Sequence, residues 1–189
     1  MHKLKQALIV VDVQNDFCPG GTLAVPHGDD VVAPLNQQIE EFLDRGEPVY
    51  KTRDWHPPTT KHFTAYGGTW PVHCVQNTTG AQFHPALKDD PRIHIISKGV
   101  GDTDGYSAFD ETGLASKLHQ QGVQELVVGG LATDYCVKNT VLDALKNGFK
   151  VKAIENAMRA VDLQPSDGER AIEEMHAAGA EIISTNHRD

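Results

Sequence analysis

Short apolar runs alternate along this chain with stretches whose apolar residues recur at helical spacing. Residues 7–13, ALIVVDV, are nearly all apolar and rich in β-branched side chains, which is typical of a strand buried on both faces. The apolar residues between Val32 and Leu43 predict a helix that ends at Gly46 and is capped by Asp29 or Asp30. The predicted strands are 7–13, 48–52, 92–97, 125–129, 150–154 and 181–184, and the later helices are 114–121, 134–146 and 169–178.

This alternation predicts an α/β fold. Successive strand–helix–strand units are right-handed and build a parallel sheet with helices on both faces. A chain of 189 residues has the length of one ordinary domain. We therefore expect a single domain over residues 1–189 with three layers, α/β/α.

Residues 54–91 interrupt the alternation. This segment is rich in proline and shows no sustained periodicity. A loop of that length inside a compact domain is usually functional. We interpret residues 54–91 as a loop insertion with a binding role.

The overall charge narrows the range of partners. The chain has 17 basic and 26 acidic residues, and the net charge of −9 argues against nucleic acid or an anionic membrane surface as the main partner. The longest apolar run ends at Asp12 and is too short for a membrane span or a secretory signal. Three cysteines without CxxC spacing argue against a disulfide framework. We therefore expect a cytoplasmic protein, and the sequence leaves its oligomeric state open, a homo-oligomer included.

Four reactive side chains fall at the ends of predicted strands. Asp12 and Asp54 follow the first two strands, Lys98 ends the third, and Cys136 opens the helix after the fourth. The carboxyl ends of parallel strands share one edge of the sheet, where ligand sites form at the reversal of strand order. Each residue alone has an ordinary explanation as a turn carboxylate, a solvated lysine or a packed thiol. Their gathering at one edge favours a catalytic site.

Cys136 has the most informative setting of the three cysteines. A glycine pair ends the strand before it, and Thr133 or Asp134 can cap the following helix, which places the thiol in a partly exposed first turn. There the helix dipole and free backbone N–H groups lower the thiol pKa and can bind an oxyanion. Cys18 and Cys74 lack this setting. From these residues alone, a catalytic and a packed Cys136 are equally compatible with the sequence.

Ten histidines are unusual for this length, and five of them lie in the middle of the chain. Imidazoles together with one carboxylate suit Zn²⁺, Fe²⁺ or Mn²⁺. The alternative is that these are polar loop residues, since their spacing matches no zinc finger or HExxH pattern. We interpret His84 and His94 as structural. The candidate ligands are Asp54, His56, His62 and His73.

Five motifs follow one another along the chain: DVQNDFCPGG at 12–21 with Leu23, DWH at 54–56, WPVHC at 70–74, KG at 98–99 and GLATDYCV at 130–137. In this order they resemble the nicotinamidase/pyrazinamidase branch of the isochorismatase-like cysteine hydrolases. The first and last motifs mark the superfamily, and DWH and WPVHC mark the nicotinamidase branch. The resemblance covers essentially the whole chain.

The resemblance implies a catalytic triad of Asp12, Lys98 and Cys136. It also implies an oxyanion hole formed by the backbone N–H groups of Ala132 and Cys136, beside a cis peptide bond between Leu131 and Ala132. The implied fold is a six-stranded, mainly parallel Rossmann-like sheet.

The resemblance further implies one divalent metal ion, with zinc expected before iron or manganese. Phe17, Trp70 and Leu131 correspond to residues that contact the substrate, and the first two flank its ring. Residues 54–91 then become a metal- and substrate-binding loop. The implied ligands are Asp54, His56 and His73, with His62 binding directly or through water.

The implied activity is hydrolysis of nicotinamide to nicotinate and ammonia in NAD salvage, with pyrazinamide as a further substrate. Two alternatives remain at this point: an amidase of the same superfamily for another small carboxamide, and a non-enzymatic metal-binding or thiol-sensing domain. A nucleotide-binding Rossmann domain is disfavoured because no GxGxxG follows the first strand.

Overall fold

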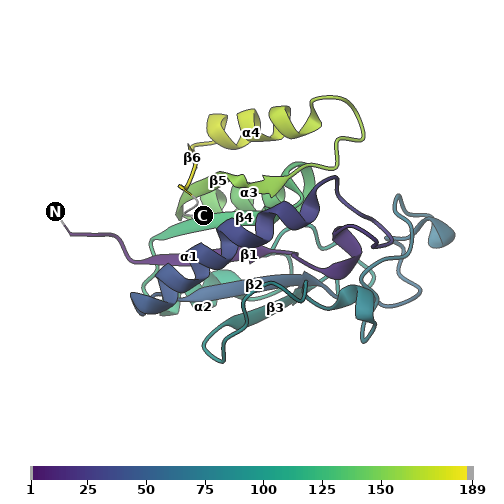
Figure 1. Ribbon diagram of the computed structural model, residues 1–189, viewed down its shortest axis with the longest axis horizontal. Coiled ribbons are helices and arrows are strands. Elements are labelled where there is room, and N and C mark those ends of the chain that lie inside the picture. Colours follow the sequence, from purple (N-terminus) through teal and green to yellow (C-terminus); the bar gives the residue numbers. More distant parts are fainter. Residues whose placement is uncertain (1, 187–189) are drawn as a thin grey trace.

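One sheet of six parallel strands forms the centre of the molecule, in a computed structural model that describes residues 2–186. The strands are β1 (Gln6–Val11), β2 (Val49–Asp54), β3 (His94–Lys98), β4 (Glu125–Leu131), β5 (Lys150–Arg159) and β6 (Glu181–Ile183). Their order is β3-β2-β1-β4-β5-β6, and every neighbouring pair is parallel (Figure 1). The order reverses between β1 and β4, as in doubly wound sheets. The predicted α/β class is confirmed. Met1 and residues 187–189 of the expected domain lie outside the described residues.

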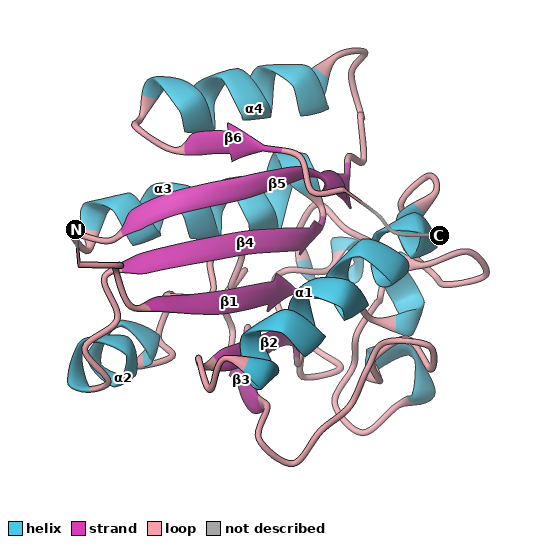
Figure 2. Ribbon diagram, turned by 60° about the vertical axis from the view of Figure 1, so that its left-hand side comes forward, coloured by secondary structure: helices cyan, strands magenta, loops and turns pink. Residues whose placement is uncertain are grey.

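Helices cover both faces of this sheet (Figure 2). Helix α1 (Val32–Asp44) packs on one face, where Leu8 and Val10 of β1 join its core. The opposite face of β1, with Ile9 and Val11, packs with residues of α2 (Leu114–Gln120), α3 (Lys138–Lys146) and α4 (Asp167–Ala177). Burial on both faces explains why the β1 sequence is almost continuously apolar. The result is the expected three-layer arrangement.

The predicted cap of the first helix is wrong. Asp29 and Asp30 lie in a 3-10 turn, Gly28–Val31, that runs directly into α1, and no side chain caps the turn or the helix. The backbone carbonyl of Asp29 accepts the N–H of Val32 at the junction, so the turn supplies the acceptor itself.

All six strands differ in length from their predictions, β5 by five residues and the others by one or two. For β5 and β3 the structure shows the reason. β5 continues to Arg159 because the register between β4 and β5 shifts near Val128 and pairing resumes at Met158. The polar residues in this irregular stretch hide the continuation from a hydrophobicity pattern. β3 begins at His94 rather than at Arg92, since the backbone N–H and the guanidinium of Arg92 both bind the carboxylate of Asp90 in a local turn.

Residues 54–91 fold as a largely irregular loop, most of which lies beyond the carboxyl ends of the strands, on the right of Figure 1. Its last residues return along α1 to the start of β3, and on this path the backbone N–H of Lys88 donates to Asn36 Oδ1. Isolated bridges join His56 to Val75, Phe63 to Trp70 and, from the first motif, Gln14 to Phe83. These bridges hold distant parts of the loop beside the ends of β1 and β2.

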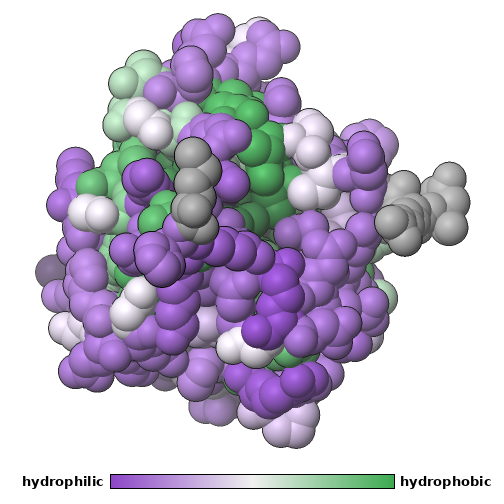
Figure 3. Space-filling view, turned by 90° about the vertical axis from the view of Figure 1, so that its left-hand side faces the viewer, coloured by the Kyte–Doolittle hydropathy of each residue, from purple (hydrophilic) through white to green (hydrophobic). Residues whose placement is uncertain are grey.

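The surface is mainly polar on the face drawn in Figure 3, where apolar side chains gather in the upper half. Large exposed apolar residues elsewhere include Tyr66, Val100 and Leu163. Within residues 2–186, none of the helices combines the length and the apolar character that crossing a membrane requires.

Candidate active site

The carboxyl ends of four adjacent strands bring the predicted reactive residues together. Asp12 directly follows β1 with a left-handed backbone (φ 50°), a conformation that is uncommon outside glycine. Asp54 and Lys98 are the last residues of β2 and β3, and these two residues are paired in the sheet register. Cys136 lies in the turn after β4. All four side chains are buried.

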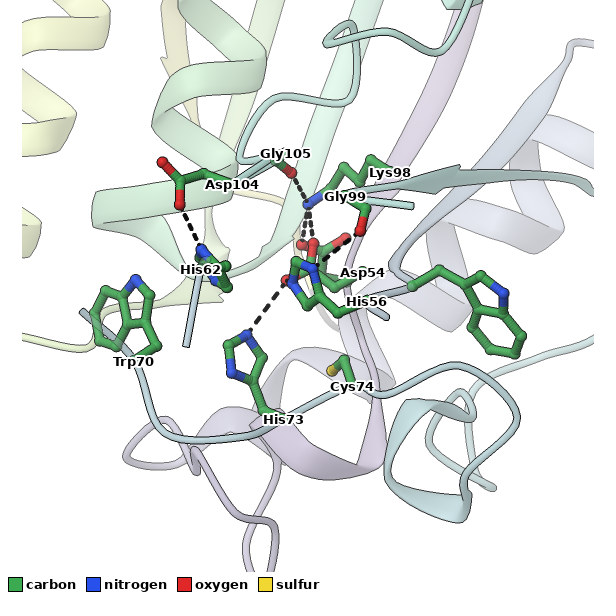
Figure 4. Close-up of polar contacts among 12 residues, drawn as sticks. Asp54, His56, His62, Trp70, His73, Cys74, Lys98, Gly99, Asp104 and Gly105 are labelled. Atoms are coloured by element: carbon green, nitrogen blue, oxygen red, sulfur yellow. Dashed lines mark hydrogen bonds and ion pairs between the residues drawn. The ribbon is translucent and has the colours of Figure 1, made fainter. Parts of the chain in front are cut away.

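The Lys98 ammonium group is the centre of this arrangement (Figure 4). Lys98 Nζ lies 2.7 Å from Asp12 Oδ2 and donates to Asp54 Oδ1 at 2.5 Å. It also contacts the carbonyl oxygen of Gly105 at 2.9 Å and Cys136 Sγ at 3.3 Å. One buried cation therefore contacts two buried carboxylates and adjoins the thiol.

These contacts set the ionisation of the three charged groups. Burial lowers the pKa of Lys98, but the charges of Asp12 and Asp54 outweigh it and hold that pKa well above its usual value. Burial raises the pKa of Asp12, and Lys98 offsets this only in part. The pKa of Asp54 moves the other way, well below its usual value, because Lys98 and two histidines outweigh its burial. Asp12 is therefore the carboxylate better suited to taking up a proton.

The Cys136 thiol differs from its sequence-based description in two respects. It is buried, with 6% of its surface exposed, rather than partly exposed. Burial raises the pKa of the thiol well above its usual range, and the charge of Lys98 opposes this only in part. The expected lowering of the pKa is wrong because desolvation outweighs the helix end and the cation. The resting group is a thiol that needs a base.

The backbone around Cys136 forms a π-helical turn, Thr133–Val137, before α3 begins. The carbonyl oxygen of Ala132 accepts the N–H groups of Tyr135 and Val137, both at 3.1 Å. No side chain caps this turn, so the predicted capping role of Thr133 or Asp134 is wrong. The peptide bond between Leu131 and Ala132 is cis, as the resemblance implied.

Asp134 contributes to the site in another way. Its two carboxylate oxygens accept the backbone N–H groups of Val161 and Asp162, each at 2.9 Å. This ties the segment after β5 to the turn that carries Cys136. Val161 thereby becomes a wall of the pocket described below.

Three buried histidines form a cluster next to the carboxylates. His56, His62 and His73 each place a ring nitrogen within 4.8 Å of the others. Their Nδ1 atoms face oxygen acceptors: the carbonyl of Gly99 at 3.1 Å, the carboxylate of Asp104 at 2.6 Å and the carbonyl of Pro71 at 2.7 Å, respectively. An oxygen of this kind can only accept, so Nδ1 carries a proton and Nε2 is the atom that can offer a lone pair to an ion.

This donor set fits a divalent metal ion. Within the described residues, His56 Nε2 is a buried polar atom without a hydrogen-bond partner. Asp54 Oδ2 lies 3.4 Å from His56 Nε2 and 3.8 Å from His73 Nε2. Nε2 atoms without a proton would turn their lone pairs toward this carboxylate, an arrangement that a cation between them stabilises. Nδ1 atoms bound to oxygen acceptors are the usual outer support of metal-binding histidines. Imidazoles with one carboxylate suit zinc, iron or manganese.

The acidity of His62 agrees with that interpretation. Burial lowers the pKa of His62, and the hydrogen bond to Asp104 only partly opposes the change. The ring is therefore neutral near pH 7, which is the form that binds metals. A second cluster, Asp12, Asp54 and Cys136, already encloses the Lys98 ammonium and is not a metal site.

The two clusters meet at one small, mainly apolar pocket. Of the predicted site residues, the pocket is lined by Asp54, His62, His73 and Cys136, by the predicted substrate contacts Phe17, Trp70 and Leu131, and by Ala132 of the predicted oxyanion hole. His56, Asp12 and Lys98 lie behind this wall. The remaining lining residues are Leu23, Val25, Tyr106, Tyr135 and Val161.

Sequence reasoning missed several residues that position this site. The amide of Gln14 pairs with both backbone groups of Asp54, each bond being 2.9 Å long. Thr52 Oγ1 donates to Asp12 Oδ1 at 2.7 Å, and Trp70 Nε1 donates to the Tyr106 hydroxyl at 2.9 Å. The Gln14 position lay inside a quoted motif and could have been singled out, whereas Thr52 and Tyr106 carry no pattern of their own.

His84 and His94 lie outside the cluster. His84 Nδ1 accepts the N–H of Ala86, and the His94 ring stacks on Tyr50 at 4.8 Å. Both contacts are local packing, in agreement with the structural role expected for these two residues.

Comparison with known proteins places this geometry in a family. The isochorismatase domain model matches residues 6–187. The chain belongs to the isochorismatase family. Among curated relatives of this family member, a nicotinamidase of Escherichia coli is 44% identical, over 95% of this chain and 94% of its own. A nicotinamidase/pyrazinamidase of Mycobacterium tuberculosis is 37% identical, over 96% of this chain and 100% of its own.

A solved structure supports the same placement. The pyrazinamidase of Pyrococcus horikoshii in complex with zinc superposes with a TM-score of 0.91 at 44% identity, covering 96% of this chain and 99% of the other. The resemblance given by the five motifs is therefore confirmed at the level of the family and its fold.

Proposed function

We propose that this chain is a nicotinamidase, a metal-dependent cysteine amidohydrolase that converts nicotinamide to nicotinate and ammonia in NAD salvage and also accepts pyrazinamide. One observation carries the proposal: the same small, mainly apolar pocket is lined by the Cys136 thiol and by His62 and His73. A pyridine carboxamide has a flat, mainly apolar ring that suits the apolar pocket. Its scissile amide suits the thiol, and its ring nitrogen suits an ion held by the histidines. The nicotinamidase and pyrazinamidase relatives support this choice of substrate.

Cys136 acts as the nucleophile and Asp12 as the base. Because the thiol is protonated at rest, its proton moves to the Asp12 carboxylate as sulfur attacks the carboxamide carbon. A carbon–sulfur bond forms, and the carbonyl π electrons move to oxygen. Asp12 then returns the proton to the amide nitrogen, the carbon–nitrogen bond breaks, and ammonia leaves.

The thioester is hydrolysed by the same residues. Asp12 takes a proton from water while the water oxygen attacks the thioester carbon, and the carbon–sulfur bond then breaks. The nicotinic acid that forms gives its carboxyl proton to solvent and leaves as nicotinate, and the Asp12 proton returns to Cys136. Lys98, 3.3 Å from the sulfur, stabilises negative charge on it and holds Asp12 in place. The backbone N–H groups of Ala132 and Cys136 receive the oxyanion.

The ring is held by the other half of the pocket. Phe17 and Trp70 flank it, with Leu131 as a further apolar contact. Asp54, His56, His62 and His73 would hold one divalent ion, zinc before iron or manganese, and the zinc complex of the Pyrococcus horikoshii relative supports that order. Such an ion supplies a binding point for the pyridine nitrogen, which anchors the substrate. We place the reaction in the cytoplasm, with nicotinamide rather than a macromolecule as the partner.

An ammonia-release assay tests this function. The zinc-loaded protein is offered nicotinamide, pyrazinamide and two aliphatic amides, asparagine and propionamide. Rapid release from the first two and at most trace release from the others is the expected result. Release from an aliphatic amide alone indicates an amidase for another small carboxamide, and release from none indicates a metal-binding or thiol-sensing domain; either result rejects the proposal.

A further inference from the structure

One loop, residues 99–106 after β3, supports both halves of the site. The Gly99 carbonyl accepts from His56 Nδ1, and Asp104 Oδ1 accepts from His62 Nδ1. The Gly105 carbonyl accepts from Lys98 Nζ. Figure 4 shows these three contacts approaching the site from the same side.

The two ends of this loop, at Gly99 and Gly105, are closely packed. Gly99 and Gly105 both have left-handed backbones, with φ of 63° and 61°. A Cβ added to Gly99 would lie 2.5 Å from His56 Cε1, and one added to Gly105 would lie 2.4 Å from Gly99 N. The carbonyl groups of Gly99 and Gly105 therefore lie at fixed positions.

Of the three contacts from this loop, the one made by Asp104 comes from a charged side chain, whereas the other two come from backbone carbonyl groups. The Asp104 carboxylate is 60% exposed, whereas the His62 ring that it holds is 2% exposed. The distance of 2.6 Å from His62 Nδ1 makes this a short, charge-assisted hydrogen bond. It fixes the ring orientation and leaves Nε2 as the atom available to a ligand. Because the carboxylate is exposed, the fold does not depend on it.

We propose that Asp104 is a positioning residue that orients His62 as a direct ligand of the metal. This inference rests on the proposed function only through the metal site. It goes further in two ways. It makes His62 itself a ligand of the ion, rather than a water bound to His62, and it names Asp104 as the side chain that orients the His62 ring. Asp104 itself touches neither the ion nor the substrate.

The test measures Zn²⁺ affinity by competition with a chromophoric chelator, on the wild-type protein and on Asp104→Ala, Asp104→Asn and His62→Ala. The double variant of Asp104→Ala with His62→Ala completes the set. Asp110→Ala removes an exposed carboxylate a short distance along the chain and is the matched control. The visible spectrum of the Co²⁺-loaded proteins reports the ligand set independently of activity.

Asp104→Ala is expected to lower Zn²⁺ affinity about 10- to 100-fold, the usual effect of losing an outer support. Asp104→Asn keeps an acceptor oxygen and should restore part of that loss. His62→Ala should lower affinity at least as much and change the Co²⁺ spectrum, and Asp104→Ala should add nothing in its background. Asp110→Ala should match the wild type.

Four results overturn the inference: no measurable binding of Zn²⁺ or Co²⁺ by the wild type, unchanged affinity in Asp104→Ala, unchanged affinity in His62→Ala, or an equal loss from Asp104→Ala with and without His62. Ammonia release from nicotinamide separates this from the proposed function. If the wild type hydrolyses nicotinamide and Asp104→Ala binds zinc normally, the inference is rejected and the proposed function stands. If zinc binding depends on Asp104 and His62 but the wild type releases no ammonia, the inference stands and the proposed function is rejected.

Discussion

Asp54 and Lys98 form the shortest link between the two halves of the site, with Asp54 Oδ1 2.5 Å from Lys98 Nζ. The other oxygen of the same carboxylate faces His56 and His73. One side chain therefore belongs both to the charge cluster beside the thiol and to the candidate metal ligands. Its backbone is held on both sides by the amide of Gln14.

Lys98→Met should destabilise the fold and slow the reaction of the thiol. Without the ammonium group, two buried carboxylates face each other uncompensated, and the free energy of unfolding should fall by about 3 kcal/mol. Alkylation of Cys136 by iodoacetamide at neutral pH should also slow, since no cation then stabilises the thiolate. Urea unfolding and the alkylation rate measure the two effects at equal metal loading.

The control for this change is Lys88→Met. Lys88 pairs with Glu40 at the surface, and the loss of such a pair costs about 0–1 kcal/mol. Equal stability of the Lys98 and Lys88 variants, or unchanged alkylation of Cys136, removes Lys98 from the proposed scheme.

Cys136→Ala should abolish turnover and leave the fold intact. Only one buried sulfur atom is lost, so the free energy of unfolding should change by about 1 kcal/mol. Activity should fall below roughly a thousandth of the wild-type value if the intermediate is covalent. Cys18→Ala, which removes a buried thiol outside the site, is the matched comparison for both stability and kcat. A Cys136 variant with higher residual activity contradicts the covalent mechanism.

The fold was predictable from sequence mainly because its two central strands, β1 and β4, are buried on both faces. The β1 and β4 sequences are nearly continuous apolar runs, a pattern that no other helix or strand within residues 2–186 shows. The prediction failed where a strand carries polar residues, as β5 does at Glu155 and Asn156 beside the register shift. The predicted side-chain cap at Asp29 or Asp30 was wrong because these residues lie in a 3-10 turn, whose backbone carbonyl at Asp29 already accepts the N–H of Val32.

The site was predictable in part. Asp12, Asp54, Lys98 and Cys136 follow strands, so topology alone brings them together. The position of His62 relative to His56 depends on how residues 54–91 fold back, and no periodicity encodes that path. Asp104 and Tyr106 act through single side-chain contacts, which leave no pattern in one sequence. The ionisation of Cys136 depends on burial, which the first-turn position did not reveal.

Tyr106→Phe should weaken substrate binding more than it slows the reaction. The Tyr106 hydroxyl accepts a hydrogen bond from Trp70 Nε1. Removing that hydroxyl leaves the largely buried indole N–H without an acceptor, at a cost of about 1–3 kcal/mol. Trp70 can then turn away from the position that flanks the ring, so KM for nicotinamide should rise several-fold while kcat changes little. Steady-state kinetics measure this, with Tyr66→Phe, an exposed tyrosine, as control. A normal KM for Tyr106→Phe refutes this role.

Cys18 should make stability depend on pH in the alkaline range. Burial, helped by the charge of Asp29, raises the pKa of the Cys18 thiol from 9.0 to about 11. The unfolded chain therefore releases this proton first, and the stabilisation present below pH 9 is lost as the pH rises toward 11. The free energy of unfolding should decline less steeply over this range in Cys18→Ala than in the wild type. Parallel pH profiles for the two proteins would show that Cys18 does not contribute.

The most direct test of the central claim compares nicotinamide with benzamide in the zinc-loaded protein. The two molecules share shape and scissile amide, but benzamide has a C–H where nicotinamide has the ring nitrogen. Phe17 and Trp70 can stack on either ring, so only the contact to the nitrogen distinguishes them. A site built for such a contact rejects an analogue without it by up to about 10⁴-fold. We predict that kcat/KM for benzamide is lower by at least about a hundredfold, and that a chelator depresses nicotinamide hydrolysis until a divalent ion is restored. Equal hydrolysis of benzamide and nicotinamide would contradict the account.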